Sequence, residues 1–408
     1  MSIQSTLTPY TRFSLVSRLD WKPLAQNNNI DVRDIQDVYP ATPFQKNLLY
    51  IANKSHGRFF TEVYQIGLPR STDVALLKQV WGAIVKKHSI LRTGFLVHND
   101  EVLAIVYHPE RPSPNTLHEQ LEEVESWSIN AVAEKIAAKS AFEPFSGQPL
   151  YAIHVIGSPQ VGYHLHLCLH HAIFDGASIK QLLISIHTHY HRGLADITAS
   201  PSYALIAGKM LEREESVIQA ALVHYKQSLG GLSDGSWPPK GSATGATQTI
   251  IRHCATSAAP NYPPFPAHII RVALALTMSL HSSNSDNVFC ETRSSRSLLP
   301  IDLQGVLGPA LYSHIVRIKC EHASALSVLL DLANDAVPRR AALSLGEIFK
   351  GLDANTASKL RVFLTVYASP FWPEDADIPG WTLLVRLLPV LAWQNHTHFA
   401  ILEPQSSP

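Results

Sequence analysis

Two neighbouring segments, YAIHVIG at 151–157 and GYHLHLCLHHA at 162–172, constrain the fold more than any other part of this sequence. Both have the composition of β-strands, and the short connection between them predicts an antiparallel hairpin. A helix follows at once, because apolar residues recur at helical spacing from Ile179 onward. We expect Ser178 and Gln181 to form the capping box at its start. A hairpin that leads directly into a helix predicts a fold of mixed strands and helices.

Strand and helix patterns recur in both halves of the chain, and a stretch rich in Gly, Ser and Pro joins the halves. We therefore expect an α/β fold, with an α+β sandwich in each of two lobes. The predicted divisions are a leader or linker at 1–36, an N-terminal lobe at 37–228, an inter-lobe loop at 229–248 and a C-terminal lobe at 249–408. Further strands are expected near 62–68, 103–108, 249–255, 361–368, 381–388 and 397–403, and helices at 128–142, 203–229, 266–281 and from Thr42, where Gln45 completes a capping box.

Composition excludes several classes of protein. Lys and Arg together number 33, as do Asp and Glu, so no net charge favours nucleic acid or an anionic membrane. The four cysteines are widely spaced, which suits a reducing compartment rather than a disulfide framework. We find no secretory signal, and the most apolar helix, at 268–280, is too short to span a bilayer. These observations predict a cytoplasmic, globular protein.

The histidines of the second hairpin strand divide between its two faces. Alternation along a strand places His164, His166, Cys168 and His170 on one face, and the leucines with His171 on the other. His171 thus leaves the strand on its apolar side, just before a helix begins. A desolvated imidazole is what a base for an amine or hydroxyl nucleophile requires. The alternative is that His171 is a structural residue at the end of a strand.

A metal site is the other reading of these histidines, but the pattern gives it little support. His164 and His166 have a spacing known from zinc sites, yet no third ligand is evident, and the polar face of an edge strand explains them equally well. His187 and His191 lie four residues apart, with Thr188 where a metalloprotease needs glutamate. The sequence also lacks GxSxG, GxxxxGK and GxGxxG, which disfavours serine hydrolases, P-loop enzymes and dinucleotide oxidoreductases.

Several short motifs occur together in a fixed order. HHAIFDG at 170–176 matches HHxxxDG, the signature of condensation domains of nonribosomal peptide synthetases and related acyltransferases of the chloramphenicol acetyltransferase type. The chain resembles this family, in its fungal form, over about residues 37–405. The other motifs that resemble those of the family are YPATPFQ at 39–45, KHSILRTGF at 87–95, FEPF at 142–145 with GQPL at 147–150, HY at 224–225 with LG at 229–230, and GP at 308–309 before VRI at 316–318.

The resemblance implies two acetyltransferase-like lobes in a V around a central tunnel. Partner carrier domains would present the substrates on 4′-phosphopantetheine arms, and no cofactor or metal would be bound. His171 would be the catalytic base, His170 would be structural, and Asp175 would pair with an arginine, for which Arg92 is our candidate. Gly176 and Ser178 would line the tunnel. The function implied is condensation of a carrier-bound acyl thioester with a carrier-bound amine or hydroxyl by a monomeric enzyme of secondary metabolism.

The sequence also departs from the family pattern. Lys87 replaces an arginine, a tryptophan-containing motif is reduced to Ser202–Ala204, and Tyr312–Ser313 stand near the place of an Asn-Thr pair. The chain stops at FAILEP, so we expect the C-terminal lobe to be incomplete. Two alternatives therefore stay open: a free-standing acyltransferase that uses coenzyme A thioesters, and an inactive docking or scaffold remnant of a synthetase.

Overall fold

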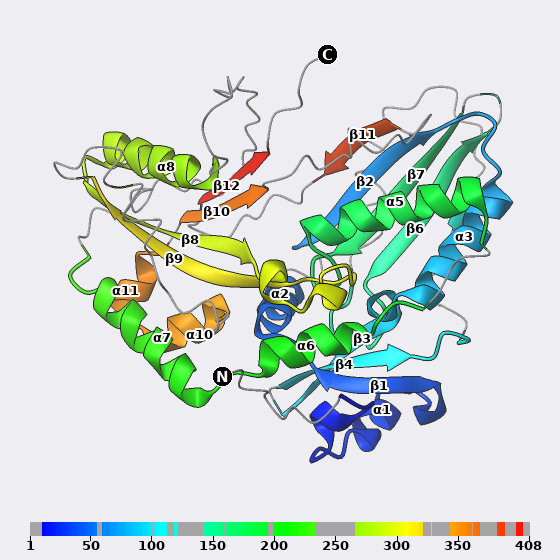
Figure 1. Cartoon of the computed structure of the whole chain (residues 1–408), viewed down its shortest axis with the longest axis horizontal. Coiled ribbons are helices and arrows are strands. Elements are labelled where there is room, and N and C mark those ends of the chain that lie inside the picture. The colour runs from blue at the N-terminus through cyan, green and yellow to red at the C-terminus, as the bar shows by residue number, and fades with distance from the viewer. Residues whose placement is uncertain are drawn as a thin grey trace. The chain divides into compact units, whose positions relative to one another are not determined.

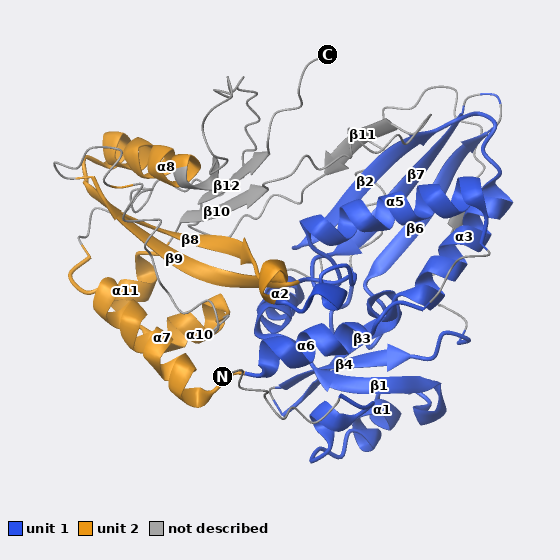
Figure 2. Cartoon of the chain, viewed as in Figure 1, with its two compact units in different colours: residues 1–212, 299–309, 378–389 blue, residues 213–298, 310–377, 390–408 orange. Residues whose placement is uncertain are grey.

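In the computed structural model of the chain, shown in Figure 1, the described residues combine helices with three β-sheets. The contacts between Cα atoms divide it into two compact units, coloured separately in Figure 2. Unit 1 comprises residues 1–212, 299–309 and 378–389, and unit 2 comprises 213–298, 310–377 and 390–408. The residues whose structure is described are 10–54, 59–99, 101–111, 118–120, 142–158, 160, 162–194, 199–232, 266–320, 328, 343–360, 362–367, 382–387 and 397–402. Most of the predicted inter-lobe loop, the predicted strand at 249–255 and nearly all of the predicted helix at 128–142 lie outside them.

The larger sheet of unit 1 carries the histidine strand at its centre. Its strands run in the order β11-β2-β7-β6-β5, and β7 pairs with both β2 and β6 in antiparallel register. The predicted hairpin is thus confirmed, but the histidine strand is central and not at an edge. His166 is accordingly buried. The bounds are β2 Thr61–Leu68, β5 His118–Gln120, β6 Tyr151–Ser158, β7 Gly162–His170 and β11 Thr382–Leu387.

Two helices pack together beside this sheet, α3 (Val74–Lys87) and α5 (Gly176–Arg192). The apolar stripe of α3 is buried as its spacing predicts, and Trp81 packs edge-on against Tyr151 of β6. Tyr151 pairs with Leu169 across the strands, so α3 covers the sheet face to which the leucines of β7 point. This is also the face on which the sequence places His171.

The start of the chain is more ordered than the sequence indicated. Residues 10–36, expected to be an irregular linker, include the helix α1 (Lys22–Asn27), and the rings of Phe13 and Trp21 stack with 5.2 Å between centroids. Trp21 and neighbouring apolar residues are buried against the small antiparallel sheet β1-β4-β3. The apolar side chains of this segment are too few to show a clear period in the sequence. Their burial against the sheet is nevertheless enough to anchor the segment. The bounds of the other elements are η1 Ser14–Val16, η2 Val32–Asp34, β1 Ile35–Pro40, α2 Pro43–Lys54, η3 Ser89–Arg92, β3 Thr93–His98 and β4 Glu101–Tyr107.

The helix predicted at 203–229 is two helices, α6 (Tyr203–Leu211) and α7 (Glu215–Ser228). The break falls where the two units meet in sequence, so α6 contributes to the core of unit 1 and α7 to that of unit 2. Both segments carry apolar residues at helical spacing, and the short connection between them holds no Gly or Pro, so the sequence pattern alone does not reveal the break.

Unit 2 is built on a four-stranded sheet in the order β12-β10-β8-β9. Its two faces are covered by different helices: Phe289 and Val316 pack with α8, whereas Cys290 and Ile315 pack with Tyr225 of α7. The strands predicted near 361–368, 381–388 and 397–403 are confirmed as β10, β11 and β12. The bounds are α8 Pro266–Ser282, β8 Asp286–Ser294, η4 Arg296–Leu298, β9 Leu311–Lys319, α10 Leu345–Gly351, α11 Ala354–Ser358, β10 Val362–Tyr367 and β12 Thr397–Leu402, with η5 Ile301–Leu303 in unit 1.

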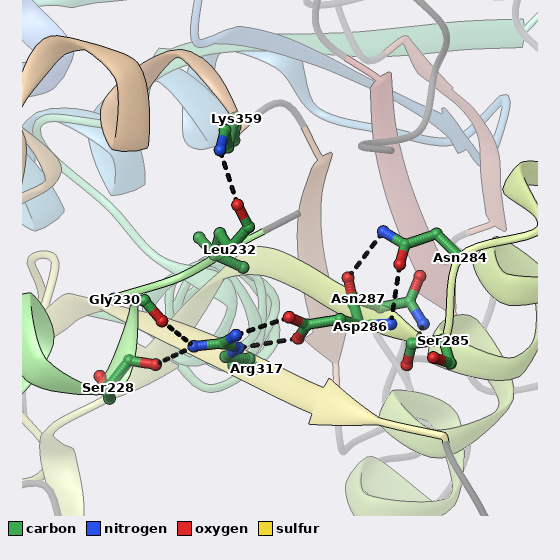
Figure 3. A network of polar contacts seen from close by, with 9 residues as sticks. All are labelled: Ser228, Gly230, Leu232, Asn284, Ser285, Asp286, Asn287, Arg317 and Lys359. Atoms are coloured by element: carbon green, nitrogen blue, oxygen red, sulfur yellow. Dashed lines mark hydrogen bonds and ion pairs between the residues drawn. The ribbon is translucent and has the colours of Figure 1, made fainter. Parts of the chain in front are cut away.

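Arg317 of β9 holds the end of α7 in unit 2 (Figure 3). Its Nη1 donates to the carbonyl oxygens of Ser228 and Gly230 at 2.6 and 2.9 Å, and its Nε and Nη2 donate to the carboxylate of Asp286. Cationic donors at a helix C-terminus satisfy carbonyls that have no partner within the helix. Nearby, Lys359 Nζ donates to the carbonyl of Leu232 at 2.7 Å.

Gly308 is a position of unit 1 where only glycine fits. Its φ is +129°, and a Cβ atom there would lie 2.2 Å from the ring of Tyr203. We expect Gly308→Ala to lower the free energy of unfolding by roughly 2–4 kcal/mol, from backbone strain and overpacking together. Urea unfolding would measure the change. Gly305→Ala is the matched control, since a Cβ there meets nothing within 4 Å, and an equal loss in both variants would contradict the assignment.

Candidate active site

His171 lies one residue beyond the end of β7, on the apolar face of the larger sheet. Its backbone amide donates to the carbonyl of Phe60 at 2.7 Å, which continues the pairing of β7 with the segment that leads into β2. Phe60 itself has a left-handed φ of 64°, an uncommon conformation that marks a tight entry to the strand. The His171 side chain is 17% exposed, so solvent reaches part of the ring. His171 therefore lies on the face that the alternation along β7 predicts.

Two side chains contact the His171 ring, and a third contacts one of them. Its Nε2 lies 2.7 Å from Oε1 of Glu62, and its ring stacks on that of Phe174 at 4.4 Å between centroids. The hydroxyl of Tyr64 in turn donates to Oε2 of Glu62. Glu62 and Tyr64 pair with Leu169 and Leu167 across the strands, so both lie on the same face as His171.

Sequence reasoning missed Glu62. The segment 62–68 was correctly predicted as a strand, but its first residue was not considered as part of a site. The only signal for Glu62 was its charge within a predicted strand. That strand pairs with β7, which leads into the HHxxxDG motif. A single sequence does not reveal which strands pair when they lie more than 90 residues apart. The contact between Glu62 and His171 therefore could not be inferred from residue spacing.

His170 has the environment of a structural residue. It is fully buried, and its Nδ1 accepts a hydrogen bond from the backbone amide of Ala172 at 3.1 Å. Burial, with a smaller contribution from the neighbouring His171, lowers the pKa of His170 to about 3. The imidazole is therefore neutral at pH 7 and stabilises the turn after β7.

The predicted ion pair between Asp175 and Arg92 is wrong. The Arg92 guanidinium donates instead to the side-chain oxygen of Gln36 and to the carbonyls of Val85 and Tyr107, and burial lowers its pKa to about 10. Asp175 is the N-cap of α5, where its Oδ1 accepts from the amide of Ser178 at 2.8 Å. The pairing with Arg92 rested on family analogy, and the Arg92 guanidinium proves to bind other acceptors.

Ser178 is a packing residue rather than part of a tunnel wall, which corrects a second expectation. It is 1% exposed, and its hydroxyl lies 2.7 Å from Oδ1 of Asp175 and 3.0 Å from both the amide nitrogen and the carbonyl oxygen of Gly308. The expected Ser178–Gln181 capping box is also wrong, because α5 begins at Gly176, earlier than the sequence indicated. Gly176 is partly exposed at the first position of α5, and its predicted role in a tunnel stays a prediction.

The motif YPATPFQ contacts the turn that carries His171. Gln45 completes the predicted capping box with Thr42, since each side chain bonds the other's backbone amide at 3.3 and 3.0 Å. Its Nε2 also donates to the carbonyl of Ala172 at 2.7 Å. Two motifs far apart in sequence are thereby joined by one buried amide.

We expect Gln45→Leu to lower the free energy of unfolding by about 2–4 kcal/mol, because it leaves the buried backbone groups of Thr42 and Ala172 without partners. Denaturant unfolding would measure the loss. The same substitution at the exposed Gln26 is the control and should change stability by less than about 0.5 kcal/mol. A Gln45→Leu protein as stable as the control would show that this link does not stabilise the turn.

Among the residues that the structure describes, no group of three His, Cys, Asp or Glu side chains has a geometry that could hold a metal ion. No described helix is both long and apolar enough to cross a membrane.

Known proteins resemble this chain at the level of both sequence and fold. The family model for the condensation domain matches residues 35–206, which include Glu62, His171 and the whole of α5. This part of the chain thus resembles the condensation-domain family, as the motifs predict.

Several proteins similar to this chain are fungal synthetases. The chain is 26% identical to nonribosomal peptide synthetase 1 of Aspergillus fumigatus over 80% of its length, and 26% identical to D-lysergyl-peptide-synthetase subunit 2 of Claviceps purpurea over 86%. It spans only 5% and 25% of these two relatives, respectively.

Solved structures share the fold. The starter condensation domain of rhizomide synthetase superposes with a TM-score of 0.64 at 10% identity, over 82% of this chain and 78% of that one. The condensation domain of a monacolin K polyketide synthase superposes with a TM-score of 0.60 at 13% identity, over 88% and 87% of the two chains. The predicted α/β fold is thereby confirmed, and it is the fold of these condensation domains.

Proposed function

We propose that this condensation domain transfers an acyl or peptidyl group from a carrier-bound thioester to a carrier-bound amine or hydroxyl in the assembly of a secondary metabolite. The single observation that carries the proposal is the position of His171. Its ring is partly exposed at the end of β7, is stacked on Phe174, and is hydrogen-bonded to a buried carboxylate. A base that is oriented in this way and still reachable is what proton transfer from a nucleophile requires.

The proposal assigns roles to individual residues. His171 accepts the proton of the nucleophile as it attacks the thioester carbonyl and returns it to the departing thiol. His170 and Gln45 hold the turn that presents His171, and Asp175 begins the helix that follows it. Partner carrier domains supply both substrates on 4′-phosphopantetheine, and the protein works as a monomer in the cytoplasm. Orientation of the two substrates would supply up to about 7–11 kcal/mol of the barrier reduction.

Matched donors test the proposal. One acyl group is offered to the purified protein as a thioester on a phosphopantetheinylated carrier and on coenzyme A, with an amine-loaded carrier as acceptor and product read by intact mass. Product from the carrier-bound donor, and none with carriers that lack phosphopantetheine, is the expected result. Equal rates from both donors would favour a coenzyme A-dependent acyltransferase. A folded protein that yields no product from either donor would contradict the proposal and favour an inactive scaffold.

A further inference from the structure

One face of β8 carries a buried carboxylate that is shared by two arginines. Glu291 lies on the face that packs against α8 (Figure 1), and its side chain is 2% exposed. Nε and Nη2 of Arg271, on α8, lie 2.8 to 3.0 Å from its two oxygens, and Nε of Arg293, on β8, donates to Oε2 at 2.7 Å. Two guanidiniums and one carboxylate leave this group with one excess positive charge.

The outer edge of the Arg293 guanidinium is available to a ligand. Its Nε is held by Glu291, and among the residues that the structure describes none accepts a hydrogen bond from Nη1 or Nη2. The side chain is 19% exposed, so solvent reaches part of it. Arginine presents its N–H groups as a planar fork that matches the paired oxygens of a carboxylate or phosphate. The contact with Glu291 fixes the orientation of this fork before any ligand binds.

Ser295 adds a buried hydroxyl without a partner on the same face. Its backbone amide donates to the carbonyl of Ala310 at 2.7 Å, which continues the antiparallel pairing of β8 with β9 by one residue. Alternation along the strand then places its side chain on the face of Glu291 and Arg293. Ser295 is 5% exposed, and its Oγ forms no hydrogen bond with any described residue. Since buried hydroxyls are almost always hydrogen-bonded, this one is a donor that a ligand would satisfy.

The charge and the donors at this position select the kind of ligand. The excess positive charge disfavours a metal cation, and an uncharged ligand would leave that charge without a counter-ion. A monoanion with two oxygens balances the charge and can accept from both the guanidinium and the hydroxyl. An ion pair that served only to hold α8 on β8 would be complete with Arg271, which alone contacts both oxygens of Glu291.

We propose that Arg293 and Ser295 form a binding site in unit 2 for a monoanionic oxyanion, either a carboxylate or a phosphate diester. Nη1 and Nη2 of Arg293 donate to its oxygens, Ser295 Oγ donates to one of them, and Glu291 positions the guanidinium. The same chemistry is present in a substrate that bears a carboxylate and in the phosphate diester that joins a phosphopantetheine arm to its carrier. Binding is therefore tested with one probe for each source.

Ligand-observed NMR with the whole chain measures the affinity for both probes. Dimethyl phosphate is followed by the width of its ³¹P signal and acetate by that of its labelled ¹³C carboxylate, at constant ionic strength. Trimethyl phosphate and acetamide, which lack the charge, are the matched neutral controls. We expect saturable broadening of the signal of at least one anion and no broadening for the neutral compounds. The anion that binds more tightly identifies the source.

Variants test the two assigned residues. Arg293→Gln removes the fork but leaves Glu291 its contacts with Arg271, and we expect it to weaken anion binding about 10–100-fold. Arg293→Lys keeps the charge without the fork, so its affinity should lie between. Ser295→Ala should weaken binding about 2–10-fold without lowering the midpoint of urea unfolding, because the hydroxyl has no described partner to lose in the free protein. Arg192→Gln, at an exposed position of α5, is the control.

A loss of affinity in the Arg293 and Ser295 variants, with Arg192→Gln unchanged, supports the site. Native protein that shows no saturable binding of either anion overturns it. Affinity that is retained in Arg293→Gln or in Ser295→Ala also overturns it. So does an equal loss in Arg192→Gln, because the response would then be a general effect of charge. Binding is measured without turnover, so none of these results depends on the proposed acyl transfer.

Discussion

His171→Gln is expected to lower the rate of acyl transfer by about 10²–10⁴-fold while leaving the protein folded. This range is what a positioned general base contributes. Glutamine can still donate a hydrogen bond to Glu62 through its side-chain amide, but it has no nitrogen that accepts a proton. Product would be quantified by intact mass under single-turnover conditions, so that chemistry rather than carrier release is measured.

Glutamine is a sharper test than alanine at this position. The buried carboxylate of Glu62 would lose its contact with Nε2 in His171→Ala, a change that lowers stability by about 1–3 kcal/mol and confuses folding with catalysis. The matched control is His164→Gln, the same substitution on the opposite face of β7. A rate within about twofold of the native one in His171→Gln would remove His171 as the base.

Acidification is expected to unfold unit 1 well before its carboxylates are protonated. Burial lowers the pKa of His88 to about 4 and the pKa values of His166 and His170 to about 3, with smaller contributions from neighbouring cationic side chains. All three imidazoles are therefore buried in the neutral form. Neither ring nitrogen of His166 has a hydrogen-bond partner in the structure.

The sign of the effect follows from the two states. The unfolded chain binds a proton at each histidine below its ordinary pKa of about 6.5, whereas the folded protein does not until the pH reaches about 3–4. Stability is thus complete above pH 6.5 and falls as the pH is lowered. Each residue removes about 1.4 kcal/mol per pH unit, so the three together remove about 6 kcal/mol by pH 5, which is comparable with the whole stability of a typical domain.

Urea unfolding at pH values from 7.5 to 5.0 would measure this slope. His166→Leu should reduce it by about a third, since one titrating group is removed, and should be tolerated at pH 7.5 because the imidazole makes no hydrogen bond there. His191→Gln, at an exposed position of α5, should leave the slope unchanged. A flat stability profile down to pH 5 would show that these histidines titrate normally in the folded state.

The sequence predicted the local features of this fold well. Three features were correctly inferred because each depends on residues close together in the chain. They are the pairing of strands 151–157 and 162–172, the capping box of Thr42 and Gln45, and the face to which His171 belongs. The family resemblance, which rests on short motifs, was also confirmed.

What the sequence could not supply is contact between distant residues. The sequence offers many possible acceptors for the guanidinium of Arg92. Only the fold determines that it donates hydrogen bonds to Gln36, Val85 and Tyr107. The partners of Ser178 and the carboxylate behind His171 depend in the same way on which strands and loops become neighbours. A periodicity of apolar residues tells which side of an element is buried but not what lies against it.

The register of β11 has a consequence for synthesis of the protein. β2 ends at Leu68, and its partner β11 begins only at Thr382, so most of the chain lies between two strands that are hydrogen-bonded in one sheet. While the polypeptide leaves the ribosome, the residues before β11 can fold early, but this edge of β2 stays unpaired until Thr382–Leu387 emerge. Such an edge is a template for pairing with other chains. A nascent chain is therefore exposed to aggregation while the segment between β2 and β11 is synthesised, and we expect the yield to depend on chaperones and on the speed of elongation.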